Sequence, residues 1–500
     1  MTRAQRAIGF GLLALGLAAP LVYVAASRAA GFSGFPLDDA FIHQTYARNL
    51  ALRGAWSYSA GEVSAGSTSP LWTVLMAGGH VLRVGLPGWP IGLGIALSLL
   101  SAWLGGAWGE RALGVPRLLG AAVLLGEWHL VWAAVSGMEI PLFVAWLMAC
   151  WWLLARLEAR AGAGWDAALG LGLVAAVGVW IRPEAILALP FLGLGATLAR
   201  GSQRQRVWRG IAVLSPALIS LLLYFTFNRL LGGGIWPNTF YAKQVEYGVL
   251  RGEGWVQRVG GQSAAILAGP LVVLAPFLLV VVYSALKQRR WERLVPMAWM
   301  IAHVAAYTAR LPVSYQHGRY LIPVIPLGLL YGAAGLRMVW ARMRGGLAGR
   351  VLVRGAWLSW GAVGLAFLVL GGRAYVRDVG LIDEEMVATA RWVEAHTPEG
   401  AVIAAHDIGA LGYYAERRLV DLGGLTSAAA LTVLRDPREL AQFLTHEGSD
   451  YLVTFPGLYP LVGKRCLAEF SSGGSISPAL GGENMRVYRW AGDCAERIGP

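Results

Sequence analysis

The chain has 500 residues, of which 56% are hydrophobic and only 14% are charged, and its mean hydropathy is +0.53. Soluble globular proteins carry about 25% charged residues, so this composition excludes a single water-soluble core. A net charge of +13 would suit a nucleic-acid-binding protein, but many of the Lys and Arg residues lie between long apolar runs, as they do in cytoplasmic loops of membrane proteins. The composition therefore predicts a polytopic membrane protein with no nucleic-acid partner.

The N-terminal segment has two interpretations. Arg3 and Arg6 precede an apolar run over residues 8–26, and the run ends in small residues. A cleaved signal peptide has the same order of features, but its apolar region is shorter, about 7–15 residues. We therefore expect a first membrane helix with a cytoplasmic N-terminus.

Further apolar runs recur as far as residue 372. About 20 apolar residues cross a bilayer as a helix, and backbone polar groups in lipid have to pair within their own segment. Basic clusters at residues 200–209, 287–293 and 337–350 are expected to be cytoplasmic. Spans are then expected at residues 118–135, 141–154, 167–180, 186–198, 211–231, 264–286, 294–308, 320–340 and 355–370.

The number of crossings depends on the location of the two ends. A cytoplasmic N-terminus and an outer C-terminus require an odd number, whereas the apolar runs count to roughly twelve. Residues 70–116 leave room for either a half-span or an additional crossing. We expect a helical bundle of roughly 11–13 spans with an odd total.

The region after residue 372 changes character. Its expected elements are an amphipathic helix at residues 384–396, short buried strands at residues 401–405 and 451–455, and a helical region at residues 427–446. Strands that alternate with helices favour a small α/β domain. The chain is thus divided into a transmembrane domain, residues 1–372, and an extracytoplasmic α/β domain, residues 373–500.

The second domain contains Cys466 and Cys494. In an extracytoplasmic compartment a disulfide between them is allowed. Two unpaired thiols are equally compatible with the sequence, which carries no information on the distance between them.

The segment after the first span contains two adjacent carboxylates, Asp38 and Asp39. Phe41, Thr45 and Arg48 follow at helical intervals and predict a helix on the membrane surface. Neighbouring like charges raise the pKa of one partner, and a carboxylate held there can act as a general base toward a hydroxyl group. The alternative is a solvated pair that is stabilised by the helix dipole.

Other polar clusters are expected on the same membrane face. Each one alone fits an ordinary interfacial anchor, but together with the paired aspartates they predict a site for a sugar phosphate. Lys243, His317 and Arg319 are candidates to neutralise a phosphate leaving group, and Tyr241 offers a flat face for a sugar ring. The candidate substrate-binding residues are Arg48, Glu62, Glu139, Arg182, Glu184, Asn238, Tyr241, Lys243, His317 and Arg319.

Known cofactor motifs give no match. The sequence has no zinc-type ligand spacing, no Walker loop and no dinucleotide-binding fingerprint in the right context. We therefore expect no cofactor and no metal. His406-Asp407 is interpreted as a turn at a strand end, with metal chemistry as the alternative.

Several motifs resemble those of the polytopic glycosyltransferases of the GT-C fold, in particular the mycobacterial-type terminal arabinofuranosyltransferases and related bacterial membrane proteins. These motifs are Asp38-Asp39-Ala-Phe-Ile, Tyr46-Ala-Arg48-Asn49-Leu, Gly61-Glu62, Thr68-Ser69-Pro70-Leu-Trp72, Ser136-Gly137-Met138-Glu139, Arg182-Pro183-Glu184, Pro237-Asn238-Thr239-Phe240-Tyr241-Ala242-Lys243, Arg319-Tyr320, His406-Asp407-Ile408-Gly409 and Val420-Asp421-Leu422-Gly423. The resemblance implies a GT-C-like bundle and a polyprenyl-phosphate donor carrying arabinofuranose or mannose. It also implies inverting transfer to an extracytoplasmic glycan, lipid or protein acceptor, with either Asp38 or Asp39 as the base.

Two other functions fit parts of the sequence. A lipid or sugar transporter, or a flippase, usually places ionisable residues near the bilayer midplane, whereas most charges here lie at span ends. A non-catalytic scaffold that displays the C-terminal domain would have Asp38 and Asp39 facing bulk water. The sequence favours the glycosyltransferase over both.

Overall fold

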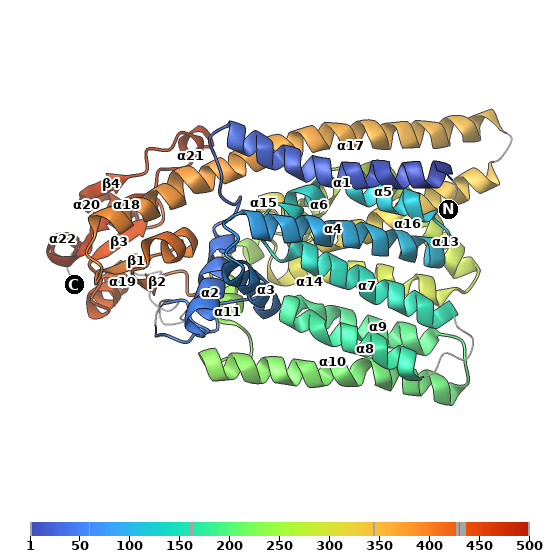
Figure 1. Ribbon diagram of the computed structural model, residues 1–500, viewed down its shortest axis with the longest axis horizontal. Helices are drawn as coiled ribbons and strands as arrows, with labels where there is room; N and C mark the ends of the chain where they lie inside the picture. Colours follow the sequence, from blue (N-terminus) through green and yellow to red (C-terminus); the bar gives the residue numbers. More distant parts are fainter. Residues whose placement is uncertain are drawn as a thin grey trace.

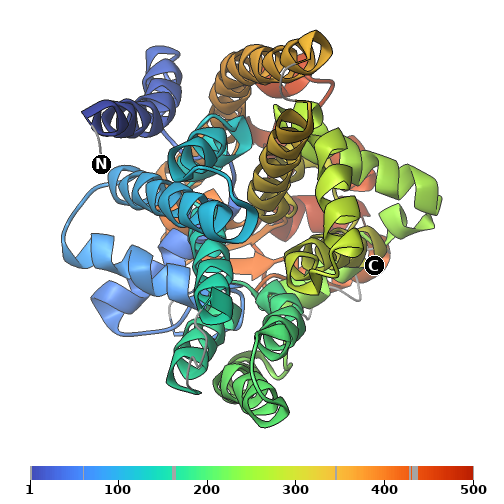
Figure 2. The ribbon, with the colours of Figure 1, turned by 90° about the vertical axis from the view of Figure 1, so that its right-hand side faces the viewer.

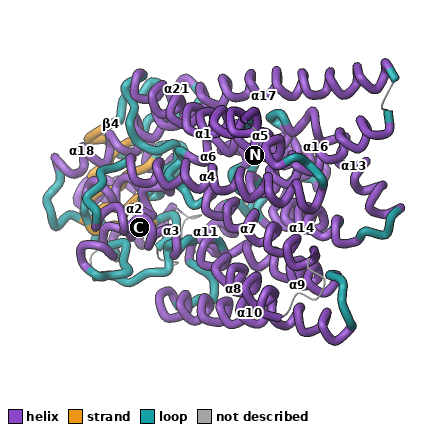
Figure 3. Tube along the Cα trace, turned by 45° about the vertical axis from the view of Figure 1, so that its right-hand side comes forward, coloured by secondary structure: helices purple, strands orange, loops and turns teal. Residues whose placement is uncertain are grey.

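The protein is a helical bundle with a small domain containing a β-sheet at one end (Figure 1). The computed structural model describes residues 3–59, 61–159, 165–343, 346–426, 430 and 437–498. The N-terminus lies toward the opposite end of the bundle from the sheet (Figure 1). Viewed along the bundle, many of the helices are seen end-on and lie side by side (Figure 2). The strands are confined to the end that carries the C-terminus (Figure 3).

The first half of the chain combines long bundle helices with short ones, of which α2 and α3 lie near the sheet domain (Figure 1). The helix α2 begins directly at Asp39 and ends at Arg53, and Gly54 follows it with a positive φ of 65° that suits glycine. Proline at the first position starts α3. The helices are α1 (Arg3–Ala29), α2 (Asp39–Arg53), α3 (Pro70–Val81), α4 (Gly88–Trp108), α5 (Arg117–Leu125), α6 (Trp128–Ala134), α7 (Ile140–Ala159), α8 (Trp165–Ile181) and α9 (Leu189–Leu198).

The second half of the bundle contains the longest helices. A capping box formed by Ser202 and Gln205 starts α10, because the two residues satisfy each other's free backbone N–H groups. The helices are α10 (Gln203–Gly232), α11 (Asn238–Glu246), α12 (Trp255–Leu267), α13 (Leu271–Lys287), α14 (Val295–Arg310), α15 (Tyr315–Gly318), α16 (Ile325–Arg342) and α17 (Leu347–Ile382).

Six helices among the described residues are long and apolar enough to cross a membrane. The bent pair α12 and α13 raises this number to seven if it is counted as one span, and α8 and the segment Pro183–Leu198 are shorter apolar helices. The chain is therefore a multi-pass membrane protein. The total of 11–13 crossings stays a prediction.

Two expected spans are broken. The run at residues 118–135 divides into α5 and α6, because Glu127 accepts the backbone N–H of His129 and thereby caps a new helix. The run at residues 264–286 bends by 108° between α12 and α13, where Gly269 and Pro270 interrupt the helix.

The C-terminal sheet has the strand order β2-β1-β3-β5-β4. The strand β1 pairs in parallel with β2 and β3, whereas β5 pairs antiparallel with β3 and β4. The expected strands at residues 401–405 and 451–455 correspond to β1 and β3. The strands are β1 (Val402–Ala405), β2 (Arg418–Asp421), β3 (Tyr451–Thr454), β4 (Ala468–Ser471) and β5 (Arg486–Arg489).

Short helices complete this domain, and Cys466 and Cys494 form a disulfide with a Cα–Cα distance of 5.2 Å. The expected helical region at residues 427–446 is described only at Ala430 and from residue 437 onward, where it is α19. The helices are α18 (Ala388–His396), α19 (Pro437–His446), α20 (Pro460–Arg465), α21 (Ile476–Ala479) and α22 (Ala495–Ile498).

A single helical rod joins the bundle to the sheet domain. The helix α17 continues through a π-helical turn, Asp383–Val387, directly into α18. The rod therefore passes the predicted domain boundary at residue 372 without interruption.

Candidate active site

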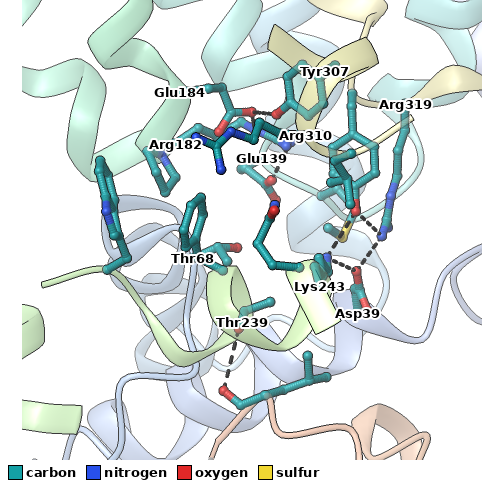
Figure 4. Close-up of a pocket in the computed structure, with 18 of the residues that line it drawn as sticks. Asp39, Thr68, Glu139, Arg182, Glu184, Thr239, Lys243, Tyr307, Arg310 and Arg319 are labelled. Carbon is teal, nitrogen blue, oxygen red and sulfur yellow. Dashed lines mark hydrogen bonds and ion pairs between the residues drawn. The ribbon is translucent and has the colours of Figure 1, made fainter. Parts of the chain in front are cut away.

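A cavity of about 290 Å³ lies in the part of the bundle that faces the sheet domain. Figure 4 shows Asp39, Lys243 and Arg319 on one side of it and Arg182 and Glu184 on another. Apolar side chains supply much of the remaining wall. They are Ile42, Met138, Ile186, Leu187, Trp236, Phe240, Leu311 and Leu425.

Asp39 forms the anionic centre of the cavity. Nη2 of Arg319 donates a hydrogen bond to Oδ2 of Asp39 at 2.7 Å, and Nζ of Lys243 lies 3.5 Å from the same oxygen. Burial would raise the pKa of Asp39, but the charges of Lys243 and Arg319 outweigh it and hold this pKa below its ordinary value. Asp39 is therefore ionised at neutral pH.

Three separate segments bring these groups together. Asp39 is the first residue of α2, Lys243 lies on α11, and Arg319 follows α15. Tyr320 links the two cations, since its hydroxyl accepts hydrogen bonds from Nζ of Lys243 at 3.0 Å and Nη2 of Arg319 at 3.1 Å. The two cations lower the pKa of Tyr320, although burial opposes them.

Arg319 has two unsatisfied donor atoms in its guanidinium group. Its side chain is buried, and its Nε and Nη1 atoms have no hydrogen-bond partner. Buried donors are normally satisfied, so these two N–H groups are an unusual feature of this site.

A second polar network crosses the cavity wall. Nη1 of Arg182 donates to Glu139 at 2.7 Å, and Nε of Arg182 also donates to Glu184. The Tyr307 hydroxyl donates to Glu184 at 2.7 Å, while Nε2 of His43 lies 3.4 Å from Glu139. These buried charges are mutually paired, which makes the network a rigid frame rather than a free anion site.

Asp38 lies apart from the cavity lining. Its two carboxylate oxygens accept the backbone N–H groups of Gly409 at 2.7 Å and Ala410 at 2.8 Å. Burial, followed by the nearby charge of Asp407, raises the pKa of Asp38 to about 7 despite these two hydrogen bonds. Asp38 therefore connects α2 to the sheet domain.

Five further sequence-predicted residues are placed outside the lining. Arg48 pairs with Glu416 at 2.9 Å, and Glu62 lies 3.4 Å from Arg418 at the surface. The remaining three are Asn238, whose amide donates to the carbonyl of Thr426 at 2.8 Å, Tyr241, and His317, whose Nε2 lies 2.6 Å from Asp378. The structure thus does not bring these five residues to the cavity.

Several polar lining residues were absent from the predicted site residues, among them His43, Thr68, Thr239, Gln244, Tyr307, Arg310 and Tyr320. His43 follows Asp39 by four residues and so shares its helical face, which is a signal that the sequence contained. Tyr307 likewise follows His303 by four residues, and their rings are in contact. Among the described residues, no group of three or more His, Cys, Asp or Glu side chains is arranged to hold a metal ion.

Comparison with known proteins agrees with this architecture. Residues 376–488 match a family described as a domain of unknown function, DUF8728, and no curated protein matches. ArnT from Cupriavidus metallidurans in the apo state is 17% identical, with a TM-score of 0.60 over 98% of this chain and 99% of that chain. The same protein bound to undecaprenyl phosphate is 15% identical, with a TM-score of 0.56 and the same coverage.

An archaeal protein is also similar. The oligosaccharyltransferase AglB from Archaeoglobus fulgidus, in complex with an inhibitory peptide and a dolichol-phosphate, is 11% identical with a TM-score of 0.52. The match covers 89% of this chain and 69% of that chain. The particular resemblance to arabinofuranosyltransferases stays a prediction. ArnT and AglB have the GT-C fold of polytopic glycosyltransferases, and the structural similarity to them shows that this chain has the same fold.

Proposed function

We propose that the protein is a glycosyltransferase that moves a sugar from a polyprenyl-phosphate donor to an acceptor hydroxyl group, with Asp39 as the general base. The observation that carries this proposal is the contact of Asp39 with Arg319 and Lys243 at the edge of a partly apolar cavity. The ArnT and AglB structures with bound undecaprenyl phosphate and dolichol-phosphate support the donor class.

The charges suit each group in the reaction. Asp39 accepts the proton of the acceptor hydroxyl, whose oxygen forms a bond to the anomeric carbon while the bond from that carbon to the phosphate oxygen breaks. The leaving polyprenyl phosphate gains negative charge, and the positive charges of Arg319 and Lys243 at the cavity stabilise it. Direct displacement of this kind inverts the anomeric configuration.

Asp39 is preferred to Asp38 as the base on geometric grounds. A base has to reach the substrate, and of the two carboxylates only Asp39 lines the cavity. The pKa of Asp38, about 7, would suit a base, but both of its oxygens are engaged by Gly409 and Ala410.

The catalytic face is proposed to be extracytoplasmic. The connections from α9 to α10 and from α13 to α14 lie at the end of the bundle opposite the sheet domain (Figure 1). Basic residues line a cavity of about 440 Å³ there, which supports a cytoplasmic location under the positive-inside rule. The Cys466–Cys494 disulfide supports an oxidising compartment for the sheet domain.

The test is sugar transfer by the purified full-length protein from a panel of radiolabelled polyprenyl-phosphate pentoses and hexoses. Asp39→Asn is expected to lower kcat by about 10²–10⁴-fold, the usual contribution of a general base. Asp166→Asn, the same change at an exposed position on α8, serves as the matched control. Full activity in Asp39→Asn would remove Asp39 from the mechanism, and an inactive wild type with every donor would contradict the donor class.

A further inference from the structure

The turn that carries Arg319 has an unusual backbone. Gln316 has φ 53° and ψ 43°, His317 has φ 59° and ψ 27°, and Gly318 has φ 61°. The left-handed region is unfavourable for residues other than glycine, and two such residues in succession are rare. Backbone strain of this kind persists only where surrounding contacts impose it, and it concentrates at functional sites.

The carboxylate of Asp378, which lies on a different helix, contacts the turn at residues 316–318. Oδ2 of Asp378, on α17, lies 2.6 Å from Nε2 of His317 and also accepts the indole N–H of Trp132 at 3.1 Å. The imidazole ring is packed edge-on against Trp128 and Trp132, with centroids 5.2 Å and 5.1 Å away. His317 is therefore fixed by a charged partner and by two aromatic rings on α6.

The turn determines where Arg319 points. The backbone N–H of Arg319 donates to the carbonyl of Gln316 at 3.2 Å, and the guanidinium group then reaches Asp39. On the other side, the carbonyl of Tyr320 lies 3.0 Å from Nε2 of His303. The conformation of residues 316–318 thus sets the direction in which the Arg319 side chain leaves the backbone.

We infer that Asp378 and His317 are positioning residues that hold the strained turn closed and thereby aim Arg319 at the donor phosphate. This inference rests on the proposed function, because it takes Arg319 as the phosphate ligand. Asp378 and His317 need not touch the substrate. Their effect on binding is transmitted through the backbone of residues 316–318.

The experiment measures the affinity of the detergent-purified full-length protein for undecaprenyl phosphate. Asp378→Asn removes the charge that anchors His317 and is expected to weaken binding about tenfold or more, which corresponds to about 1.4 kcal/mol. The thermal unfolding midpoint is recorded for each variant, so that loss of folding is distinguished from loss of the turn.

A backbone rescue separates positioning from general damage. The Gln316 side chain is exposed and makes no hydrogen bond among the described contacts, so substitutions there act chiefly on the backbone. Glycine adopts positive φ without cost, so Gln316→Gly in the Asp378→Asn background is expected to restore most of the affinity. Gln316→Val in the wild-type background is expected to weaken binding, because a β-branched residue disfavours positive φ.

Glu384→Gln is the control for stabilisation of an unrelated kind. Glu384 accepts the backbone N–H groups of Ser475 and Ile476 in the sheet domain. Any change in affinity or unfolding midpoint caused by Glu384→Gln is expected to be the same with and without Gln316→Gly. Wild-type affinity in Asp378→Asn, or an affinity loss that Gln316→Gly fails to restore, would overturn the inference while the proposed function stands. A wild-type protein that does not bind undecaprenyl phosphate would overturn both.

Discussion

Asp38 and Asp39 are neighbours in the chain but interact with different parts of the molecule. Side chains of consecutive residues at a helix start point in different directions, so Asp39 faces the cations of the cavity while Asp38 faces the sheet domain. Their electrostatic situations differ accordingly, since Lys243 and Arg319 lower the pKa of one and burial raises the pKa of the other. Proximity in sequence is therefore no guide to the environment of each carboxylate.

The cation next to Asp39 is expected to control the pH dependence of the reaction. Lys243→Gln removes a charge that lowers the pKa of Asp39, so this pKa rises and the base becomes protonated at a higher pH. The acid limb of the pH profile of kcat/KM is expected to move to higher pH, in addition to an overall loss of rate. Lys464→Gln, at an exposed position in the sheet domain, is the matched control, and an unmoved acid limb would refute the assignment.

Gly409 is expected to tolerate no side chain. A Cβ atom at this position would collide with the backbone carbonyl and carboxylate of Asp38. Gly409→Ala is therefore expected to destabilise the fold by about 1–3 kcal/mol, measured as a lower thermal unfolding midpoint. Gly400→Ala, where a Cβ atom meets nothing within 4 Å, is expected to be neutral; equal midpoints for the two variants would contradict this contact.

At the scale of the helix, hydropathy predicted where apolar segments lie but not where they break. The single expected span at residues 118–135 became α5 and α6 because Glu127 caps a new helix by accepting the N–H of His129, a local contact that an average of hydropathy does not register. Pro70 at the start of α3 and Gly54 just after α2 are also local features, because each suits the backbone conformation at its position. The extent of an apolar segment is thus readable from average hydropathy, whereas a break depends on single capping, glycine or proline residues within it.

The contact between α13 and α16 depends on small residues. A Cβ atom at Gly332 would lie 2.6 Å from Cβ of Leu274 and 2.7 Å from its carbonyl oxygen. Close helix approach in membranes relies on such positions, so Gly332→Ala is expected to cost about 1–3 kcal/mol of stability. The control is Gly361→Ala on α17, where a Cβ atom has open space; a thermal unfolding midpoint for Gly332→Ala as high as that of this control would argue against tight packing.

For the molecule as a whole, the orientation in the membrane is open to a direct test. Cys150 is buried and the other two cysteines are paired, so one added cysteine is a clean reporter. Glu399→Cys near the sheet domain is expected to react with a membrane-impermeant maleimide in intact cells, whereas Gln203→Cys at the start of α10 is expected to react only after lysis. The reverse pattern would place the cavity on the cytoplasmic side.

That several of the predicted residues lie near one another could be anticipated, because they share one end of the bundle. Placing Asp39, Glu139, Arg182, Lys243 and Arg319 together required only the order of the spans and the charge of the loops. The direction of each side chain was beyond that reasoning. His317 is two residues from Arg319, yet the left-handed turn sends it to Asp378 on the other side of the turn.

The continuous helical rod from α17 through α18 can be compared in length with the thickness of a membrane. It comprises 50 residues, Leu347–His396, and at 1.5 Å per residue it is about 75 Å long. The hydrocarbon layer takes up only about 30 Å of that length. The rod is therefore longer than a membrane is thick, and its end beyond the hydrocarbon layer leads without a break into the sheet domain.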